Sequence, residues 1–382
     1  MSIWISSLRS NWHARISVKR LIVAAACSRP FVRAAVAAGF EVVAVDAFCD
    51  ADTCRDATQA IQLSFVQGGF DAAEFRRRIF PLMTGSGFVL AYGSGFETQP
   101  ELLEEIAGCC QLIGNDAETV GRAKNPAYFF SLLRSLDIPH PELARSPPSQ
   151  ADGWLAKRTG GSGGTHVQDE MVVARDYYYQ RRLPGQSYSL LFLADGLQAS
   201  AVGYNQQLLA PAKTMPYRYG GAVSHAALPR SVQDGMLDVA QRITQALGLR
   251  GLNSLDCMVD GTRFWVLEIN PRLSATFALY DASNSGAQLL RAHLSACDGE
   301  MTVDLPAEPA QAHLIYYAPR DLLIPAGMAW PQWVADVPPE ASRVQFDAPV
   351  CTIMATAASA DAALELARSR VAELTQRLCG AE

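Results

Sequence analysis

The chain has 382 residues, of which 49% are hydrophobic and 18% are charged. This composition indicates an ordered globular protein with two or three packed units and argues against disorder. The formal net charge is −6, and the sequence has no long basic run. Nucleic acid and anionic membrane surfaces are therefore not expected as partners, because both are bound mainly through clustered Lys and Arg. The apolar runs are too short to span a bilayer.

The nine cysteines are scattered and show neither a metal-site spacing nor a disulfide framework. This pattern favours reduced thiols and a cytoplasmic location. Residues 1–20 contain four basic residues and no acidic one. They lack the apolar core of a secretory signal, although an Arg- and Ser-rich start also resembles an organelle transit peptide. We interpret 1–20 as an N-terminal extension, either loosely ordered or mis-assigned.

Residues 21–117 are expected to form an open α/β domain. Continuous apolar runs predict buried strands at 21–28, 41–48, 87–93 and 111–114, with helices at 30–38 and 99–108. Gly39 is placed to end the first helix. Uninterrupted apolar strands alternating with short helices are typical of a parallel sheet that is covered on both faces.

Residues 118–300 are expected to form a second, mixed domain. Asn125 and Pro126 suit the cap and first turn of a helix that runs to 136. A short strand at 154–159, strand-like runs over 176–204 and a helix at 231–247 follow. A hairpin is predicted over 253–271, around the turn signal Asp260-Gly261, and then a helix over 286–296.

Residues 301–382 are expected to form a third, smaller α/β unit. Strands are predicted at 312–317 and 349–356, and a long amphipathic helix at 360–378. The fold class predicted for the whole chain is therefore α/β, with α+β parts.

The segment LEINPR, residues 267–272, carries the strongest chemical signal. Side chains two apart on a strand share a face, so Glu268 and Asn270 point the same way. Their oxygens are hard ligands that suit Mg²⁺. Arg272 lies on the same side if the strand continues past Pro271, and its guanidinium could brace a phosphoryl group. The competing interpretation is a buried Glu paired with an Arg.

Asp256 lies in the strand before this segment. A two-residue loop at 260–261 would place Asp256 and Glu268 on opposite faces of the hairpin. A three-residue loop or a β-bulge would place them on the same face. A metal site that uses both carboxylates requires the second arrangement.

Two lysines are candidate phosphate ligands. Lys157 ends a strand and precedes a glycine-rich loop that could cradle phosphates with backbone N–H groups. The loop consists of Gly160, Gly161, Ser162, Gly163 and Gly164, and it matches neither the Walker nor the Rossmann pattern. Lys124 stands next to a helix start, which attracts anions. A mobile surface turn and a solvated lysine are the competing interpretations.

Residues 177–193 read as a strand, a Pro-Gly turn and another strand. Such a linker could offer backbone groups to an adenine edge, although an ordinary connection is the simpler interpretation.

Taken in order, these segments resemble the ATP-grasp superfamily over about residues 21–300. The quoted segments are AKNPAYFFSLLRSLDIPHP, WLAKRTGGSGG, YQRRLPGQSYS and GLNSLDCMVDGTRFWVLEINPR. The resemblance implies a Rossmann-like pre-ATP-grasp domain, an ATP-grasp domain and a small C-terminal α/β domain like that of biotin carboxylases. It implies ATP and Mg²⁺ as cofactors. The resemblance implies that Lys124, Lys157 and the loop 160–164 bind the phosphates, and that the backbone of Arg181 and Leu183 contacts adenine. It implies that Asp256, Glu268 and Asn270 bind Mg²⁺ and that Arg272 stabilises the transferring phosphate. Arg272 and Lys157 are therefore the candidate catalytic residues.

Two positions depart from the family pattern. Members usually carry Glu at the hinge and a second acid that binds the ribose, where this sequence has Gln180 and Ser187.

The segments GSGFETQPELL and PVCTIMA further resemble a group of ATP-dependent carboligase-like proteins associated with one-carbon metabolism and with tetrahydromethanopterin and methanofuran-type cofactors. That resemblance implies an amide ligation, for instance of an amino acid such as glutamate to a cofactor precursor.

The function expected is therefore an ATP-dependent carboxylate–amine ligase that acts on small molecules through an acyl phosphate. A nucleotide-binding regulatory or scaffold protein is the main rival. A nicotinamide-dependent oxidoreductase is a second rival, which lacks a glycine fingerprint after the first strand. The sequence is compatible with a homodimer but does not fix the oligomeric state.

The acceptor pocket is expected between the first two domains. Parallel sheets bind ligands at the carboxyl ends of their strands. The expected pocket residues are Ser28, Arg29, Tyr92 and Ser94 and, from a loop over 217–221, Tyr217 and Tyr219. Arg29 could pair with a substrate carboxylate and the tyrosines could stack on a ring. Ordinary turn residues and exposed aromatic residues are the competing interpretation.

Overall fold

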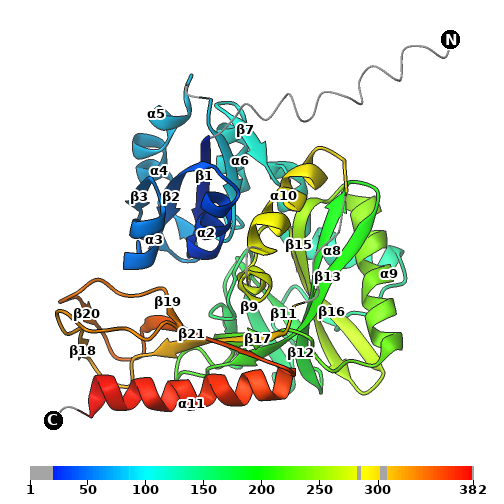
Figure 1. Cartoon of the computed structure of the whole chain (residues 1–382). Helices are drawn as coiled ribbons and strands as arrows, with labels where there is room; N and C mark the ends of the chain where they lie inside the picture. The colour runs from blue at the N-terminus through cyan, green and yellow to red at the C-terminus, as the bar shows by residue number, and fades with distance from the viewer. Residues whose placement is uncertain (1–19, 86, 282–284, 302–307, 381–382) are drawn as a thin grey trace.

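A computed structural model describes residues 20–85, 87–281, 285–301 and 308–380. The predicted N-terminal extension falls almost entirely outside these residues. A parallel sheet, a small antiparallel sheet and a large antiparallel sheet organise the described chain, as Figure 1 shows. In this part of the chain none of the helices combines the length and the apolar character needed to cross a membrane.

The parallel sheet has the strand order β3-β2-β1-β6-β7. Its strands are β1 (Arg20–Ala25), β2 (Glu41–Asp46), β3 (Gln59–Gln62), β6 (Val89–Tyr92) and β7 (Gln111–Ile113). The helices of this unit are α2 (Arg29–Ala37), α3 (Ala51–Asp56), α4 (Ala72–Arg78), α5 (Phe80–Met83) and α6 (Pro100–Ala107), and a short hairpin joins β4 (Phe65–Val66) to β5 (Gly69–Phe70). The predicted strands β1, β2, β6 and β7 are confirmed. The edge strand β3 was not predicted, because only two of its four residues, in QAIQ, are apolar.

A small antiparallel sheet follows in the order β10-β9-β11-β8. It comprises β8 (Leu143–Ala144), β9 (Trp154–Arg158), β10 (Val167–Gln168) and β11 (Tyr177–Arg181). Two consecutive helices lead into it, α7 (Ala117–Lys124) and α8 (Pro126–Ser135). The Asn125 side chain accepts a hydrogen bond from the Tyr128 N–H at 3.1 Å, which confirms the predicted helix cap.

The large sheet has the order β16-β15-β12-β13-β14-β17-β21-β19. Its strands are β12 (Gln186–Asp195), β13 (Ala199–Leu209), β14 (Tyr219–Val223), β15 (Arg250–Asp260), β16 (Arg263–Asn270), β17 (Ala310–Tyr317), β19 (Val334–Ala335) and β21 (Pro349–Ala357). Four helices of the described chain pack on this sheet: α9 (Arg230–Leu247), η1 (a 3-10 helix, Ala275–Tyr280), α10 (Ser285–Cys297) and α11 (Ala360–Cys379). A separate two-stranded sheet consists of β18 (Leu322–Leu323) and β20 (Arg343–Val344). The strands of the C-terminal segment thus continue this sheet, and α11 runs beneath β17 and β21 (Figure 1). The domain boundaries at 117 and 300 stay a prediction.

Packing between α2, α10 and η1 holds the parallel sheet above the large one. One shared hydrophobic cluster contains residues of β1, α2, β12, β15, η1 and α10. Phe31 of α2 and Phe277 of η1 meet edge to face, with ring centroids 5.1 Å apart. This contact brings the carboxyl ends of β1 and β2 over one face of the large sheet.

Candidate active site

Asp256 and Glu268 are direct partners across the β15–β16 hairpin. The turn is Gly261-Thr262, between the paired residues Asp260 and Arg263. A two-residue turn alone would place the two carboxylates on opposite faces of the hairpin. A β-bulge restores their alignment, because Cys257 pairs with Val266 and the register shifts past Leu267. The arrangement that a shared metal site requires is therefore present.

Hydrogen bonds tie these side chains into one cluster. Lys124, the last residue of α7, donates from Nζ to Glu268 Oε2 at 3.1 Å and to Asn270 Oδ1 at 2.7 Å. Asn270 Nδ2 donates to Asp256 Oδ2 at 3.1 Å. Glu268 is thus paired with a lysine rather than with an arginine.

The two carboxyl groups differ in their tendency to ionise. Burial favours a raised pKa for Glu268, but the positive charges of Lys124 and Lys157 lower it well below the usual range. Burial and the negative charge of Glu268 raise the pKa of Asp256. Asp256 Oδ1 is buried without a hydrogen-bond partner among the described residues. A cation beside Asp256 would relieve both the repulsion and the missing bond.

The donor set fits Mg²⁺. Within the described ranges, no three His, Cys, Asp or Glu side chains group closely enough to hold an ion. Two carboxylates and one amide oxygen would therefore supply only part of a coordination shell. Mg²⁺ commonly completes its shell with water and substrate phosphate oxygens.

Arg272 lies beside this cluster and is held by Glu97. Its Nε donates to Glu97 Oε1 at 2.5 Å, and its Nη2 lies 3.5 Å from Asn270 Oδ1. Glu97 Oε2 also accepts hydrogen bonds from the Gly95 and Phe96 N–H groups, at 2.8 and 3.1 Å. Sequence reasoning missed Glu97 as a site residue, although its segment, GSGFETQ, was singled out. The buried pair aims one edge of the guanidinium at the cluster.

Lys157 is the cation of the site that is left without a partner. It lies in β9, and no hydrogen bond or ion pair of its ammonium is found within the described chain. Burial lowers its pKa, whereas the charges of Glu268 and Asp256 raise it. Lys157 therefore lies within electrostatic reach of both carboxylates and can bind a phosphate.

The loop 160–164 folds back over the site between β9 and β10. Gly163 O accepts a hydrogen bond from the Tyr219 N–H at 2.9 Å. Gly164 has φ +70°, and a Cβ there would lie 1.9 Å from the Tyr217 carbonyl oxygen, so only glycine fits. His166 follows the loop and was not predicted; burial lowers its pKa to about 4, so the imidazole is neutral.

A narrow cleft lies beside the cluster. It combines glycine-loop backbone, aromatic side chains and charged groups, and is lined by Ala123, Lys124, Pro126, Phe129, Phe130, Arg158, Gly160, Gly161, His166, Tyr178, Leu267 and Glu268. Apolar walls and converging polar groups are usual in sites for small molecules. The aromatic residues come from α8 and β11, which place them opposite β16.

The predicted hinge follows this cleft. The Arg181 N–H donates to the Glu142 carbonyl at 2.8 Å, and Leu183 lies just beyond the end of β11. Gln180 is only 1% exposed, and its Nε2 has no partner among the described residues. Ser187 donates to Gln207 Oε1 at 2.7 Å, so the two form a polar pair where an acid was expected.

The residues expected around the acceptor lie near the carboxyl ends of β1 and β6, but most already have partners. Ser28 is fully buried and donates to Asp46 Oδ2 from both N and Oγ, at 2.6 and 2.7 Å. Tyr92 is buried, and its hydroxyl donates to the Asn115 carbonyl at 2.6 Å. Ser94 is half-buried, and its carbonyl accepts from the Ala26 N–H at 3.0 Å.

Arg29 is held by aspartates of this chain. Its Nε donates to Asp336 Oδ1 at 2.5 Å and lies 3.8 Å from Asp52 Oδ2. The guanidinium that was expected to bind a substrate carboxylate therefore joins α2 to the segment after β19.

The predicted loop over 217–221 is wrong, because Tyr219, Gly220 and Gly221 begin strand β14. The glycines suggested a turn, but they allow β14 to lie close to β17. A Cβ on Gly221 would lie 2.1 Å from the His313 carbonyl oxygen. Tyr219 OH lies 2.8 Å from His313 Nε2, and Tyr217 OH donates to Asp169 Oδ1 at 2.8 Å.

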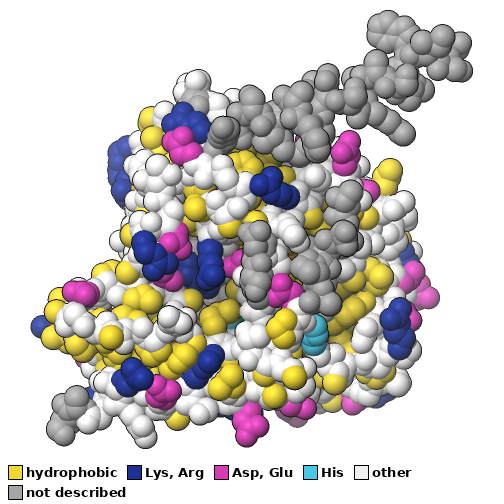
Figure 2. All heavy atoms as spheres, in the orientation of Figure 1, with side chains coloured by type: hydrophobic (Ala, Val, Ile, Leu, Met, Phe, Trp, Pro, Cys, Tyr) yellow, Lys and Arg dark blue, Asp and Glu magenta, His cyan; other side chains and the backbone are white. Residues whose placement is uncertain are grey.

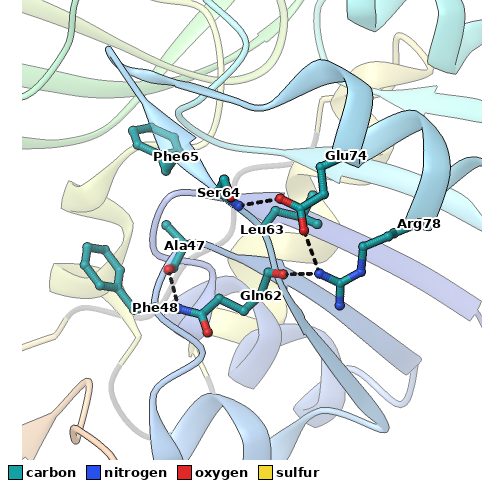
Figure 3. Close-up of a pocket in the computed structure, with 8 residues that line it drawn as sticks. All are labelled: Ala47, Phe48, Gln62, Leu63, Ser64, Phe65, Glu74 and Arg78. Carbon is teal, nitrogen blue, oxygen red and sulfur yellow. Dashed lines mark hydrogen bonds and ion pairs between the residues drawn. The ribbon is translucent and has the colours of Figure 1, made fainter. Parts of the chain in front are cut away.

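A second concavity, of about 580 Å³, opens at the carboxyl ends of β2 and β3 (Figure 3). Its charged groups are already paired, since Arg78 Nη1 donates to Glu74 Oε1 at 2.8 Å and to the Gln62 carbonyl at 2.7 Å. Phe48 and Phe65 supply its apolar wall. It lies apart from the cluster around Glu268.

Comparisons with known proteins agree with this architecture. Residues 125–276 match the family model of the ATP-grasp domain. Together with the structural likenesses below, this match shows that the chain has an ATP-grasp fold, which confirms the predicted fold class.

Individual relatives are distant. The carbamoyl phosphate synthase large chain of Rubrobacter xylanophilus is 24% identical over 255 residues, which cover 59% of this chain and 24% of that protein. The chain thus spans about a quarter of that relative's length. One similar solved structure is the biotin carboxylase domain of Hydrogenobacter thermophilus 2-oxoglutarate carboxylase, in complex with MgADP, ADP and bicarbonate. The TM-score is 0.70 and the sequence identity 12%, and the match covers 92% of this chain and 89% of that one. Carboxyaminoimidazole ribonucleotide synthase from Aspergillus clavatus, complexed with ATP, has a TM-score of 0.66 at 13% identity, covering 94% and 98%.

Proposed function

We propose that this chain is an ATP-dependent carboxylate–amine ligase that uses Mg²⁺ and forms an acyl phosphate. The observation that carries the proposal is the cluster in which Asp256, Glu268 and Asn270 meet the cations Lys124 and Arg272. Solved structures of the same fold hold MgADP or ATP, which supports both cofactors. The acid and the amine would both be small molecules.

The residues divide the work of the first step. Asp256, Glu268 and Asn270 would hold Mg²⁺, which offsets charge on the phosphoryl oxygens when bound. Lys157, Lys124 and the loop 160–164 would bind the phosphates, and the backbone of Arg181 and Leu183 would face the base. A substrate carboxylate oxygen attacks the γ-phosphorus, and ADP leaves. Arg272, positioned by Glu97, stabilises the charge on the transferred phosphate.

In the second step an amine nitrogen attacks the acyl carbon. The bond to phosphate breaks, the amine loses a proton, and an amide and inorganic phosphate leave. The finer part of the proposal is that the reaction joins an amino acid such as glutamate to a precursor of a one-carbon cofactor. The resemblance of GSGFETQPELL and PVCTIMA to carboligase-like proteins supports it.

Hydroxylamine trapping tests the first step without knowledge of the amine, because hydroxylamine converts an acyl phosphate into a hydroxamate. The protein is incubated with Mg-ATP, hydroxylamine and each of the twenty amino acids in turn, then with other carboxylate pools. We expect one carboxylate to give hydroxamate and ADP in equal amounts. Glu268→Gln is the inactive control. ADP release that never yields hydroxamate would overturn the acyl-phosphate mechanism.

A nucleotide-binding regulatory or scaffold protein is the second candidate. Gln180 and the Ser187–Gln207 pair favour it, since they stand where acids were expected. It predicts ATP binding by calorimetry with no carboxylate-dependent ADP formation.

A further inference from the structure

His166 lies in the cleft beside the cluster around Glu268 and takes no part in the proposed ligase steps. It directly precedes β10, and its carbonyl oxygen accepts a hydrogen bond from the Arg158 N–H at 3.2 Å. Arg158 is the neighbour of Lys157 in β9. The imidazole lines the cleft together with Lys124 and Glu268. The β9–β10 hairpin therefore places a histidine among the groups that would bind phosphates.

The imidazole has a ring nitrogen without a partner. His166 is 7% exposed, and its Nδ1 is buried with no hydrogen-bond partner among the described residues. The backbone of Ser162 lies near enough to influence the ring, but it does not give Nδ1 a hydrogen bond. An unpaired polar atom in the interior costs free energy that an apolar side chain of the same size would avoid. Nδ1 therefore has a hydrogen bond to offer to a ligand in the cleft.

The glycine-rich loop makes room for this ring. A Cβ on Gly161 would lie 2.2 Å from His166 Cγ and 2.4 Å from His166 Cβ, so a larger residue at position 161 would displace the imidazole. Gly160 and Gly161 line the same cleft as the ring. Backbone N–H groups of such a loop can bind phosphates, and the imidazole lies directly against this backbone. A shift of the loop as a nucleotide enters would uncover Nδ1.

The imidazole is neutral at pH 7. Burial, followed by the charges of Lys157 and Lys124, lowers the pKa of His166 to about 4, although Glu268 acts in the opposite direction. A neutral imidazole carries one N–H group, which can be at either ring nitrogen. Nδ1 can therefore serve as a hydrogen-bond donor without bringing a positive charge into the cleft.

Positive charge is concentrated in the cleft rather than over the whole molecule. The net charge of the chain is −6, and basic and acidic side chains are interspersed on the face shown in Figure 2. Lys124, Arg158 and Glu268 are the charged residues among those that line the cleft, and the charge of Lys157 also reaches His166. A further cation at position 166 would be repelled by these three. A neutral donor adds a hydrogen bond for an anion without that repulsion.

We propose that His166 donates a hydrogen bond from Nδ1 to a phosphate oxygen of the nucleotide bound in this cleft. The inference rests on the proposed ATP site and adds a neutral phosphate ligand to its lysines and its loop. A metal ion would lack ligands at His166, because within the described ranges no three His, Cys, Asp or Glu side chains group closely enough to hold one. The contact requires a phosphate, so it should strengthen the binding of ATP and ADP but not of adenosine.

Isothermal calorimetry on the full chain with Mg-ATP and Mg-ADP tests this assignment, and saturation-transfer NMR measures the weaker binding of adenosine. His166→Asn keeps an N–H donor near the position of Nδ1, whereas His166→Gln carries its donor near the position of Nε2. His166→Gln and His166→Ala should weaken ATP and ADP binding by roughly 10- to 100-fold, the range for a hydrogen bond to a charged group, and His166→Asn should stay within about threefold of the wild type. Adenosine binding should not change. The exposed control His225→Asn should match the wild type.

Three results would overturn the assignment, with the folding of each variant checked by thermal melting. Wild-type ATP affinity in His166→Gln would show that no phosphate contact is lost. A parallel loss of adenosine binding would show that the ring only shapes the cleft. An equal loss in His166→Asn and His166→Ala would show that the donor is not at Nδ1.

The outcome for His166 is separate from that of the hydroxamate assay. If hydroxamate forms while His166→Gln binds ATP as the wild type does, the ligase proposal stands and the His166 assignment falls. If the phosphate-dependent loss of affinity is seen while no hydroxamate forms, the reverse holds.

Discussion

Asp256 and Glu268 face each other across β15 and β16, although a two-residue turn joins these strands. A bulge at Leu267 shifts the pairing by one residue and so places both carboxylates on the same face of the hairpin. The pair shares Lys124 and Asn270 as neighbours, yet only Glu268 bonds to the lysine. Asp256 keeps a buried oxygen without a partner among the described residues. This asymmetry leaves a position next to Asp256 where a cation would be held by both carboxylates.

Substitution of the proposed metal ligands should abolish catalysis without unfolding the chain. Glu268→Gln and Asn270→Ala should each lower carboxylate-dependent ATP turnover by roughly 100- to 1000-fold, because charge stabilisation on the phosphoryl oxygens is lost. Turnover is measured as ADP release. The exposed control Glu104→Gln should behave as the wild type. Wild-type rates in both ligand variants would remove the metal from this cluster.

Lys157 should contribute to nucleotide binding more than its surface counterparts. Lys157→Met should weaken ATP binding by about 1–3 kcal/mol, the scale of a charge-assisted contact. Isothermal calorimetry with Mg-ATP measures the change, and Lys213→Met, on an exposed loop, is the matched control. An affinity equal to that of the wild type would place Lys157 outside the phosphate site.

Much of the fold follows from local pattern. Apolar runs located β1, β2, β6 and β7, and the period of α9 and α11 located those helices within a few residues. Glu268 and Asn270 were found because polar side chains two apart in an apolar strand point to one face. The bulge that aligns Asp256 was left open, since nothing local in the sequence selects a bulge over a longer turn.

What the sequence did not reveal depends on distant contacts. Arg29 and Asp336 are 307 positions apart, and Arg272 and Glu97 are 175 apart. From the sequence alone, Arg29 appears available to bind a ligand, because only the folded chain brings Asp336 next to it. The same reason hid the start of β14, where the glycines that suggest a turn allow close packing against β17.

The Arg272–Glu97 pair should stabilise the fold as well as position the guanidinium. Glu97→Gln should lower the free energy of unfolding by about 3 kcal/mol at pH 7, because a buried charge loses its partner. Burial opposes ionisation of Glu97, but Arg272 and Lys124 lower its pKa below the usual range. Its contribution is therefore present above an unfolded pKa of about 4.3 and is lost as the pH falls through the lower native value. Urea unfolding across this range measures the difference between wild type and variant, and a constant difference would contradict the pairing.

Asp50 should have the opposite effect on stability. Burial and neighbouring carboxylates raise its native pKa to about 8, against about 3.9 in the unfolded chain. Between these values the native state binds more protons than the unfolded state, so this residue makes stability fall as the pH rises.

Asp50→Asn removes the charge and keeps the shape of the side chain. The variant should be more stable than the wild type at pH 8, on the order of 2 kcal/mol, and no more stable below about pH 3, where the wild-type carboxyl is protonated in both states. The charged groups that act on Asp50 are Asp336, Asp46, Asp52 and Arg29. Of these, Arg29 and Asp336 form an ion pair that the substitution leaves in place. Thermal melting from about pH 3 to 9 without ligand measures the gain. If the variant is less stable than the wild type at pH 8, the Asp50 carboxylate has a stabilising partner and its native pKa is not raised.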